Sequence, residues 1–174
     1  ASPSAAEVNI TQRVTNEEPY DVRDIDVSPD GLGVVFAMRG PLDDDMDEDE
    51  GPSWNIWEYN IATDTLRRVI PSDIIAEEGQ DVSPHYLPDG RIVFSSTRQR
   101  QAKAILLDEG KPQFEAQNEA RDEPAFVLHV MNADGGGIKQ ISFNQSHDLD
   151  ATVLSNGRVL WTRWDRGPGR DGMH

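Results

Sequence analysis

The sequence contains no cysteine, and this absence limits the chemistry available to its 174 residues. Without thiols the segment forms no disulfide, no thiolate nucleophile and no cysteine-ligated metal site. It also lacks the CxxCH motif that attaches c-type haem. Chains without cysteine occur on both sides of a membrane, so this absence leaves the compartment open.

Basic residues are scarce as well. The chain has 16 Lys and Arg against 32 Asp and Glu, which gives a formal net charge of -16. Nucleic-acid binding depends on basic side chains that neutralise phosphates, so we predict no nucleic-acid partner. Anionic membrane surfaces are disfavoured for the same reason. No apolar run approaches the ~20 residues of a transmembrane helix, so we predict no membrane insertion.

Short catalytic motifs are missing too. The sequence has no GxSxG elbow, no glycine-rich phosphate loop and no HExxH helix. We therefore predict no catalytic residue and no cofactor-binding residue within this segment. Whether the protein as a whole is an enzyme stays open.

Three stretches do repeat the same order of turn and strand. The clearest is LPDGRIVFSSTR from Leu87 to Arg98, in which Pro-Asp-Gly precedes a short apolar run. SPDGLGVVFAMR from Ser28 to Arg39 and LSNGRVLWTRW from Leu154 to Trp164 repeat this order. Asp or Asn followed by Gly suits a tight turn, and the β-branched and aromatic residues suit a buried strand. Such an internal repeat predicts a repeat architecture.

The second half of each unit repeats as well. Ile56–Asn60 is followed by Leu66–Val69, and Val127–Asn132 is followed by Ile138–Ser142 after a glycine-rich turn. These runs alternate with period two, as strands with one buried face do. Without its insertion each unit is roughly 42 to 48 residues long, the length of a four-stranded propeller blade. The sequence therefore predicts an all-β fold, a partial β-propeller made of four-stranded antiparallel blades.

The repeat also predicts how the chain is divided. The predicted parts are an outer strand of a preceding blade at residues 1–15, a blade at 16–78 with an acidic loop at 41–52, a blade at 79–145 with an insertion at 99–124, and the truncated start of a further blade at 146–174. The first part rests on the alternation in Val8–Thr15. Because propellers usually have four to eight blades, we expect the segment to be cut from a longer chain. Remaining blades or domains of that parent chain would then be its partners.

Three longer stretches resemble a known family of propellers. The stretches are VSPHYLPDGRIVFSSTRQRQ, FVLHVMNADGGGIKQISFN and SHDLDATVLSNGRVLWTRWD. They resemble the WD40-like repeats of TolB-type β-propellers, and the run from Trp57 to Trp164 resembles the middle domain of hydrazine synthase alpha subunits and their bacterial relatives. The resemblance implies a propeller in a bacterial, extracytoplasmic, periplasmic protein. It carries no catalytic residue into this segment, because the c-type haem of that family would be bound elsewhere in the parent protein.

Several functions fit this resemblance. The first is a binding or scaffold module within a larger protein that resembles the hydrazine synthase alpha subunit, with other proteins as partners. An alternative is part of a c-type-haem oxidoreductase whose catalytic residues lie outside the segment. A further alternative is a TolB-like periplasmic binding propeller or the propeller domain of a peptidase. CxxCH motifs in the full-length gene would favour the oxidoreductase.

The acidic run between Pro41 and Pro52 suggests one candidate metal site. Carboxylates alternate at Asp43, Asp45, Asp47 and Asp49, and Ca²⁺ prefers such hard oxygen ligands. The spacing does not fit an EF-hand, since the sixth position has no Gly and the twelfth no bidentate Glu. The alternative is a solvated acidic loop without a bound ion, and this is the interpretation we favour.

A second candidate site lies where the third repeat begins. His147, Asp148 and Asp150 precede its first apolar strand, at the channel or rim of the expected propeller. A histidine with two carboxylates could form a metal or acid–base site. In the repeat alignment, however, Asp150 matches Ser83 and Asp24. We therefore favour a structural role, in which residues at this position bond to backbone and connect adjacent blades.

The insertion between Gln99 and Pro124 is the last feature that the repeat does not explain. It contains AKAILLDEG and FEAQNEARDE, two stretches that could each form a short helix on either side of Gly110-Lys111-Pro112. Long insertions in compact domains are often functional. We predict that this one forms an interface with a neighbouring domain or subunit.

Overall fold

The structure, a computed structural model, describes residues 6–43, 45, 51–112 and 114–164. Antiparallel strands dominate it. The first sheet contains β1 (Asp21–Val27), β2 (Gly33–Arg39), β3 (Asn55–Asn60) and β4 (Thr65–Arg68). The second contains β5 (Asp81–Tyr86), β6 (Ile92–Ser96), β7 (Val127–Met131) and β8 (Lys139–Gln140), and β9 (Asp148–Val153) pairs with β10 (Val159–Arg163). The helices are α1 (Gln12–Thr15), α2 (Asp73–Ala76) and α3 (Arg100–Asp108).

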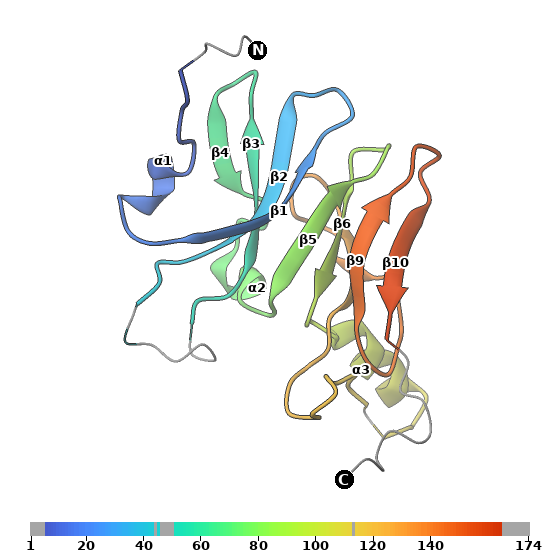
Figure 1. The fold of residues 1–174 in the computed structure, drawn as a ribbon. Helices are drawn as coiled ribbons and strands as arrows, with labels where there is room; N and C mark the ends of the chain where they lie inside the picture. Colours follow the sequence, from blue (N-terminus) through green and yellow to red (C-terminus); the bar gives the residue numbers. More distant parts are fainter. Residues whose placement is uncertain (1–5, 44, 46–50, 113, 165–174) are drawn as a thin grey trace.

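The prediction of four-stranded antiparallel sheets is confirmed for β1–β4 and for β5–β8. In both sheets each strand pairs with the next strand along the chain. The three sheets stack in chain order, with β5 against β1, β2 and β3, and β9 against β5, β6 and β7 (Figure 1). The division of the chain into blades at particular boundaries stays a prediction.

Apolar side chains fill the spaces between the sheets. Val35, Ile56 and Phe94 belong to a buried cluster that joins the β1–β4 and β5–β8 sheets. Val93, on the opposite face of the second sheet, packs with Val153 and others against the β9–β10 sheet. Each fully buried side chain of this size stabilises the fold by about 1.5–3 kcal/mol. The middle sheet is therefore held by apolar packing on both faces.

The repeated turns join an inner strand to the strand beside it. The Gly90 N–H donates to the Leu87 carbonyl at 2.9 Å, and the Gly157 N–H donates to the Leu154 carbonyl at 2.8 Å. Gly90 has a φ of 84° and Gly157 a φ of 79°, a conformation that glycine adopts without the steric cost of a Cβ. The turns lie at the same end of the stack, the upper end in Figure 1, and α3 lies at the opposite end. The hairpins could therefore be predicted from sequence, because the residues of each turn favour that turn by themselves.

Each inner strand also carries a β-bulge at the same position of the repeat. The register shifts place Asp24, Ser83 and Asp150 in the bulges, opposite Phe36, Phe94 and Trp161. The φ values of the three bulge residues are 56°, 51° and 52°. Positive φ is uncommon for residues other than glycine, so its occurrence at the same position of three inner strands shows that the bulge is a repeated structural feature. The alignment of Asp150 with Ser83 and Asp24 is confirmed in the backbone.

Two aspartates of β1 use this bulge to hold β5. The Asp24 carboxylate accepts hydrogen bonds from the Ser83 N–H at 3.0 Å and from the Ser83 hydroxyl at 3.2 Å. The Asp26 carboxylate accepts from the Tyr86 N–H at 2.9 Å. We call these contacts the inter-sheet latch. Hydrogen bonds to an ionised acceptor are stronger than those between neutral groups, so the latch fixes how β5 lies on β1.

The N-terminal part of the chain differs from its prediction. The outer strand expected at Val8–Thr15 is wrong, because residues 6–10 are irregular and Gln12–Thr15 forms α1. The Asn9 side chain accepts a hydrogen bond from the Thr11 N–H at 3.0 Å as the helix begins. The Arg13 side chain then pairs with Asp64 at 2.6 Å in the β3–β4 turn. The turn at Asn9 and this distant pair favour a helix over the extended form that alternation suggested.

Candidate functional site

The insertion between β6 and β7 begins with α3, and its sequence explains why it is helical. Ala102, Ile105 and Leu106 are spaced to share one face, and the helix contains good helix formers. Gly110, with a φ of 66°, follows the last turn, and its N–H donates to the Leu107 carbonyl at 3.0 Å. The first of the two predicted helices is thus confirmed.

The second predicted helix, within Phe114–Glu123, is wrong. This stretch forms turns and bends, with an isolated bridge between Gln117 and Pro124. The buried Gln99 amide explains the difference. It donates to the Ala116 carbonyl at 2.9 Å and to the Ala125 carbonyl at 3.0 Å, and its oxygen accepts from the Ala116 N–H at 2.8 Å. One side chain therefore supplies hydrogen bonds that a helix would otherwise provide, and it fixes the base of the insertion.

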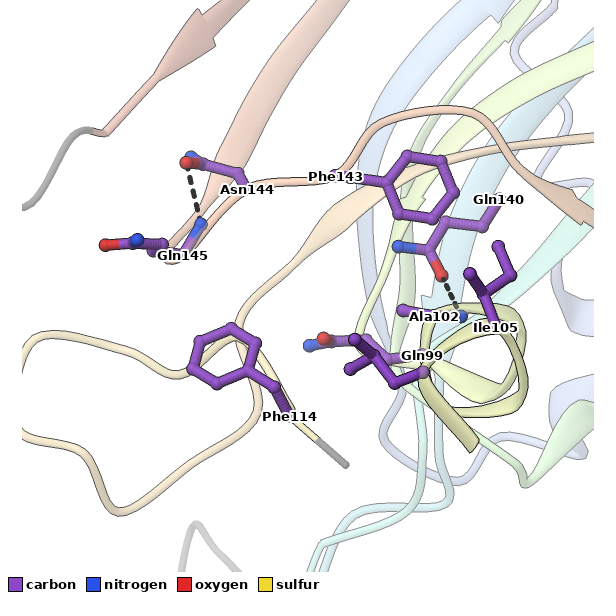
Figure 2. Close-up of a pocket in the computed structure, with 9 residues that line it drawn as sticks. Gln99, Ala102, Ile105, Phe114, Gln140, Phe143, Asn144 and Gln145 are labelled. Atoms are coloured by element: carbon purple, nitrogen blue, oxygen red, sulfur yellow. Dashed lines mark hydrogen bonds between the residues drawn. The ribbon is translucent and has the colours of Figure 1, made fainter. Parts of the chain in front are cut away.

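A second buried amide joins α3 to the sheet beneath it. The Gln140 oxygen, on β8, accepts from the Ala102 N–H at 3.3 Å, and its nitrogen donates to the Ser142 carbonyl at 2.9 Å. Ala102 lies in the first turn of α3, where helix N–H groups lack partners within the helix. Figure 2 shows this contact beside Phe143, which follows β8. The end of β8 and the start of α3 are held together in this way.

Between α3 and the β8–β9 connection lies a groove of about 550 Å³. Its exposed apolar side chains are Ile105, Phe114 and Phe143, which are 42%, 52% and 51% exposed (Figure 2). The groove residues are Gln99, Ala102, Ile105, Leu106, Phe114, Gln140, Phe143, Asn144 and Gln145, and none of them is charged. An uncharged groove stands out in a chain with a net charge of -16. Its size is that of a small ligand site or a recess for a few side chains.

Hydrogen bonds within the protein occupy most polar groups of this groove. The Gln99 and Gln140 amides bond to backbone groups as described above. The Asn144 nitrogen donates to the carbonyls of His147 and Trp164, at 3.1 and 3.0 Å, and its oxygen accepts from the Gln145 N–H at 2.8 Å. Since these groups are already paired, an occupant of the groove would meet mainly apolar surface.

The residues predicted at the start of the third repeat have separate roles. The His147 ring nitrogen Nδ1 accepts a hydrogen bond from the Phe126 N–H at 3.1 Å, and the ring lies between Phe126 and Trp164. Burial lowers the pKa of His147, so the neutral ring is favoured. Asp148 is fully buried and accepts from Arg163, whereas Asp150 is exposed on its bulge. These contacts give His147 and Asp148 a structural explanation.

Asp148 belongs to an ion pair that sequence reasoning missed. Arg163 donates to both of its oxygens, with Nε to Oδ1 at 2.8 Å, and the Trp161 indole N–H donates to Oδ1 at 3.3 Å. The same pair occurs in each sheet, as Asp21 with Arg39, Asp81 with Arg98, and Asp148 with Arg163. The signal was present in the sequence, since every repeat begins its inner strand with Asp and carries an Arg at or just after the end of the next strand.

The predicted calcium ligands are only partly described. The Asp45 N–H donates to the Asp43 carboxylate at 3.0 Å, which is a local turn contact. Asp47 and Asp49 lie outside the described residues. Across the described ranges, no group of three or more His, Cys, Asp or Glu side chains could hold a metal ion. The calcium site therefore stays a prediction.

Two buried titratable groups lie near the base of α3. Burial raises the pKa of Asp81 to about 6, although the Arg98 guanidinium and the Ser96 hydroxyl oppose this shift. Burial also lowers the pKa of His129, on β7, to about 4. At neutral pH Asp81 is thus ionised and paired, and His129 is neutral.

In the described part of the chain, no helix is long and apolar enough to cross a membrane.

Comparison with known proteins adds information on the fold. No family profile and no curated protein matches the sequence. The chain is similar in structure to a protein described as TolB from Agrobacterium tumefaciens, with 18% sequence identity and a TM-score of 0.53, over 86% of this chain and 40% of that one. It is similar to hydrazine synthase from Kuenenia stuttgartiensis, also with 18% identity and a TM-score of 0.53, over 80% of this chain and 21% of that one.

The chain thus spans less than half the length of either neighbour. Similarity at this level of identity bears on the fold alone, because one fold hosts many functions. The narrower resemblance to hydrazine synthase alpha subunits stays a prediction. The stacked four-stranded sheets and these neighbours together indicate a TolB-like, propeller-type fold.

Proposed function

We propose that this chain forms consecutive blades of a larger β-propeller that acts as a protein-binding module, and that the groove beside α3 is its docking surface. The observation that carries the proposal is the exposure of Ile105, Phe114 and Phe143 around an uncharged groove. Exposed apolar side chains gathered at one concave site are typical of interaction surfaces.

The chemistry of the groove favours one class of occupant, an apolar segment of another protein or domain. A polyanion would require basic side chains, and none of the described residues that line the groove is charged. A sugar would require free hydrogen-bonding groups, whereas the Gln99, Gln140 and Asn144 amides are already paired. Large apolar side chains need neither, and their burial against Phe114 and Phe143 would stabilise the complex.

The proposal also includes the cellular location of this module and the larger protein that contains it. The likeness to TolB supports an extracytoplasmic, bacterial periplasmic location, with the remaining blades supplied by the parent protein. A haem enzyme built around this propeller would need CxxCH motifs outside this sequence, and a peptidase would need its catalytic residues there. The groove would serve the same purpose in either case, by docking a neighbouring domain or subunit.

Site-specific photo-crosslinking would test the docking surface. p-Benzoylphenylalanine replaces Phe143 in the polypeptide as its natural host makes it, and the crosslinked peptide is identified by mass spectrometry. We expect a single protein segment that carries at least two large apolar side chains. A synthetic peptide of that segment should bind the protein in calorimetry, and Phe143→Ser should weaken its affinity at least tenfold.

The matched control is Ile74, an exposed apolar residue of α2 that does not line the groove. Crosslinking from position 74 should not yield the same segment, and Ile74→Ser should leave the peptide affinity unchanged. If both positions crosslink to the same proteins, or if the peptide binds Phe143→Ser as tightly as the wild type, the groove is not the docking surface.

A further inference from the structure

Among the residues that the structure describes, none covers the outer face of the β9–β10 sheet, whereas the equivalent faces of the other two sheets are covered. One position of the repeat lies directly before its aromatic residue. It is occupied by Val35 on β2, Val93 on β6 and Leu160 on β10. Val35 and Val93 are 0% exposed, because each lies under the next sheet in the stack. Leu160 is 58% exposed. A large apolar side chain is thus uncovered where its two counterparts are buried.

The same face presents an acidic bulge residue in the conformation of Asp24. Asp150 has a φ of 52°, against 56° for Asp24. In the inter-sheet latch, the Asp24 carboxylate accepts from the N–H and hydroxyl of Ser83 on the following sheet. The Asp150 carboxylate is exposed, and it makes no hydrogen bond or ion pair with any residue that the structure describes. Asp150 therefore has the geometry of a latch residue without a strand to hold.

We propose that this face binds the inner strand of a further sheet of the same repeat, supplied by the parent polypeptide, and that Asp150 latches that strand. Its carboxylate would accept from the backbone N–H of the bulge residue there, and from a hydroxyl if that residue is Ser or Thr. The strand would cover Leu160 as the β5–β8 sheet covers Val35. The interface would continue the two that already exist between the three sheets.

A second copy of this chain fits the face less well. Its own first inner strand is β1, and the bulge residue of β1 is Asp24 rather than a serine. A second copy would bring this carboxylate close to Asp150 and would supply no hydroxyl donor, and like charges repel. The net charge of -16 opposes self-association as well. A following sheet with a donor at its bulge meets neither obstacle.

The test compares three aspartates in the polypeptide as its natural host makes it. Asp24→Ala breaks a latch that is present, Asp150→Ala would break the proposed one, and Asp108→Ala changes an exposed residue of α3. We expect Asp24→Ala and Asp150→Ala to lower the thermal midpoint by similar amounts, about 2–8 °C, while Asp108→Ala leaves it unchanged. If Asp150→Ala behaves like Asp108→Ala, the proposal is overturned.

A second variant tests whether a sheet covers this face even if the hydrogen bonds of Asp150 contribute too little stability to detect. Leu160→Asp should lower the midpoint at least as much as Asp150→Ala if a sheet covers the site, and it should have little effect if the site faces solvent. A molar mass that doubles with concentration, and that Leu160→Asp returns to the monomer value, would show a second copy instead and overturn the proposal. This inference rests on the propeller arrangement proposed above and not on the groove. If the latch proposal fails, Asp150→Ala leaves the midpoint unchanged, whereas failure of the groove proposal would appear only in peptide affinity.

Discussion

The Asp–Arg pair that recurs in each sheet differs between its copies in burial. Asp81 and Arg98 are both buried, whereas the Asp21 and Arg39 side chains are 44% and 26% exposed. Arg98 Nε donates to Asp81 at 3.1 Å, and Arg98 also donates to the carbonyl of Ile75, in α2, at 3.0 Å. An ion pair out of contact with water depends on both partners, because either charge alone would be desolvated without compensation. The same motif should therefore contribute differently in different sheets.

Removal of the arginine tests this difference. We expect Arg98→Ala to lower the free energy of unfolding by about 3–5 kcal/mol, because it leaves Asp81 buried and unpaired. Arg39→Ala, at the partly exposed pair, should lower it by about 0–1 kcal/mol. Urea denaturation at pH 7 measures both. A double variant with leucine at positions 81 and 98 should recover much of the loss, and equal losses in the two single variants would contradict this account.

The buried imidazole on β7 predicts sensitivity to acid. Because the pKa of His129 in the folded protein is about 4, the unfolded chain binds a proton there at a higher pH than the folded chain does. Stability from the neutral ring is present above pH 6.5 and is lost as the pH falls toward 4. We expect His129→Phe to reduce the loss of unfolding free energy between pH 7 and pH 4.5 by about 2–3 kcal/mol.

Asp81 supplies the control, because burial raises its pKa, whereas burial lowers the pKa of His129. Its raised pKa means that the folded protein takes up a proton before the unfolded chain does, so this group gains stability as the pH falls from 6 toward 4. Asp81→Asn should therefore steepen the acid-induced loss that His129→Phe reduces. The two variants would be compared by urea denaturation at matched pH values. Parallel curves for wild type and His129→Phe would show that the ring is not the acid-sensitive group.

At the scale of elements, the repeated turns and the strands beside them were the part of the fold that sequence could predict. Asp-Gly and Asn-Gly pairs specify their hairpins locally, and the repeat aligned Asp24, Ser83 and Asp150. The failures involve distant contacts. Val8–Thr15 alternates as a strand would, but Arg13 reaches Asp64 from a helix. Likewise, the buried Gln99 amide holds as a loop a stretch whose composition favoured a helix.

The sequence did not predict the groove, because its residues come from segments that lie apart in the chain. The sequence predicts that the insertion forms an interface, but it gave no indication of Phe143, which lies on the β8–β9 connection outside the insertion. The Gln140 contact with the start of α3 brings the two segments together. That contact follows from how β7 and β8 pair, which no local pattern encodes.

The β7–β8 turn provides a prediction at this scale. Gly135 has a φ of 81°, and a Cβ at this position would lie 2.2 Å from the Val69 carbonyl oxygen of the first sheet. Gly90 has a similar φ of 84°, yet a Cβ there would meet nothing within 4 Å. We expect Gly90→Ala to cost about 1–2 kcal/mol for the backbone alone. Gly135→Ala should cost clearly more, because the turn must also move away from the neighbouring sheet.

Thermal or urea denaturation of the two glycine variants measures that difference. An equal loss in both would show that the turn is free to move, and that contact between Gly135 and Val69 does not position the second sheet against the first. A larger loss in Gly135→Ala would show that the turn acts as part of the interface between the sheets.

For the whole molecule, net charge is the dominant electrostatic property. The chain has 32 acidic and 16 basic residues, so even if every basic side chain were paired, a net charge of -16 would remain. Self-repulsion of this kind destabilises a compact state. It also keeps copies apart, which suits a module that exposes apolar side chains at its groove.

Added salt should therefore stabilise the protein. Between about 0.01 M and about 0.15 M NaCl the Debye length falls from about 30 Å to about 8 Å, which screens repulsion across the molecule. We expect the thermal midpoint to rise over this range in differential scanning fluorimetry. A control series with a neutral osmolyte of equal osmolarity separates screening from exclusion effects. A midpoint that falls with NaCl would mean that attractive pairs dominate instead.

The stacking of sheets in chain order has a consequence for how the protein is made. Each sheet is one continuous stretch of chain, and it packs on the sheet that precedes it. The β1–β4 sheet can thus form while later residues are still inside the ribosome, and it then offers β5 a finished surface. Protease protection of nascent chains stalled just after β4 has emerged would detect this order. The sheets would then form one at a time as the chain emerges from the ribosome, each packing against the sheet formed before it.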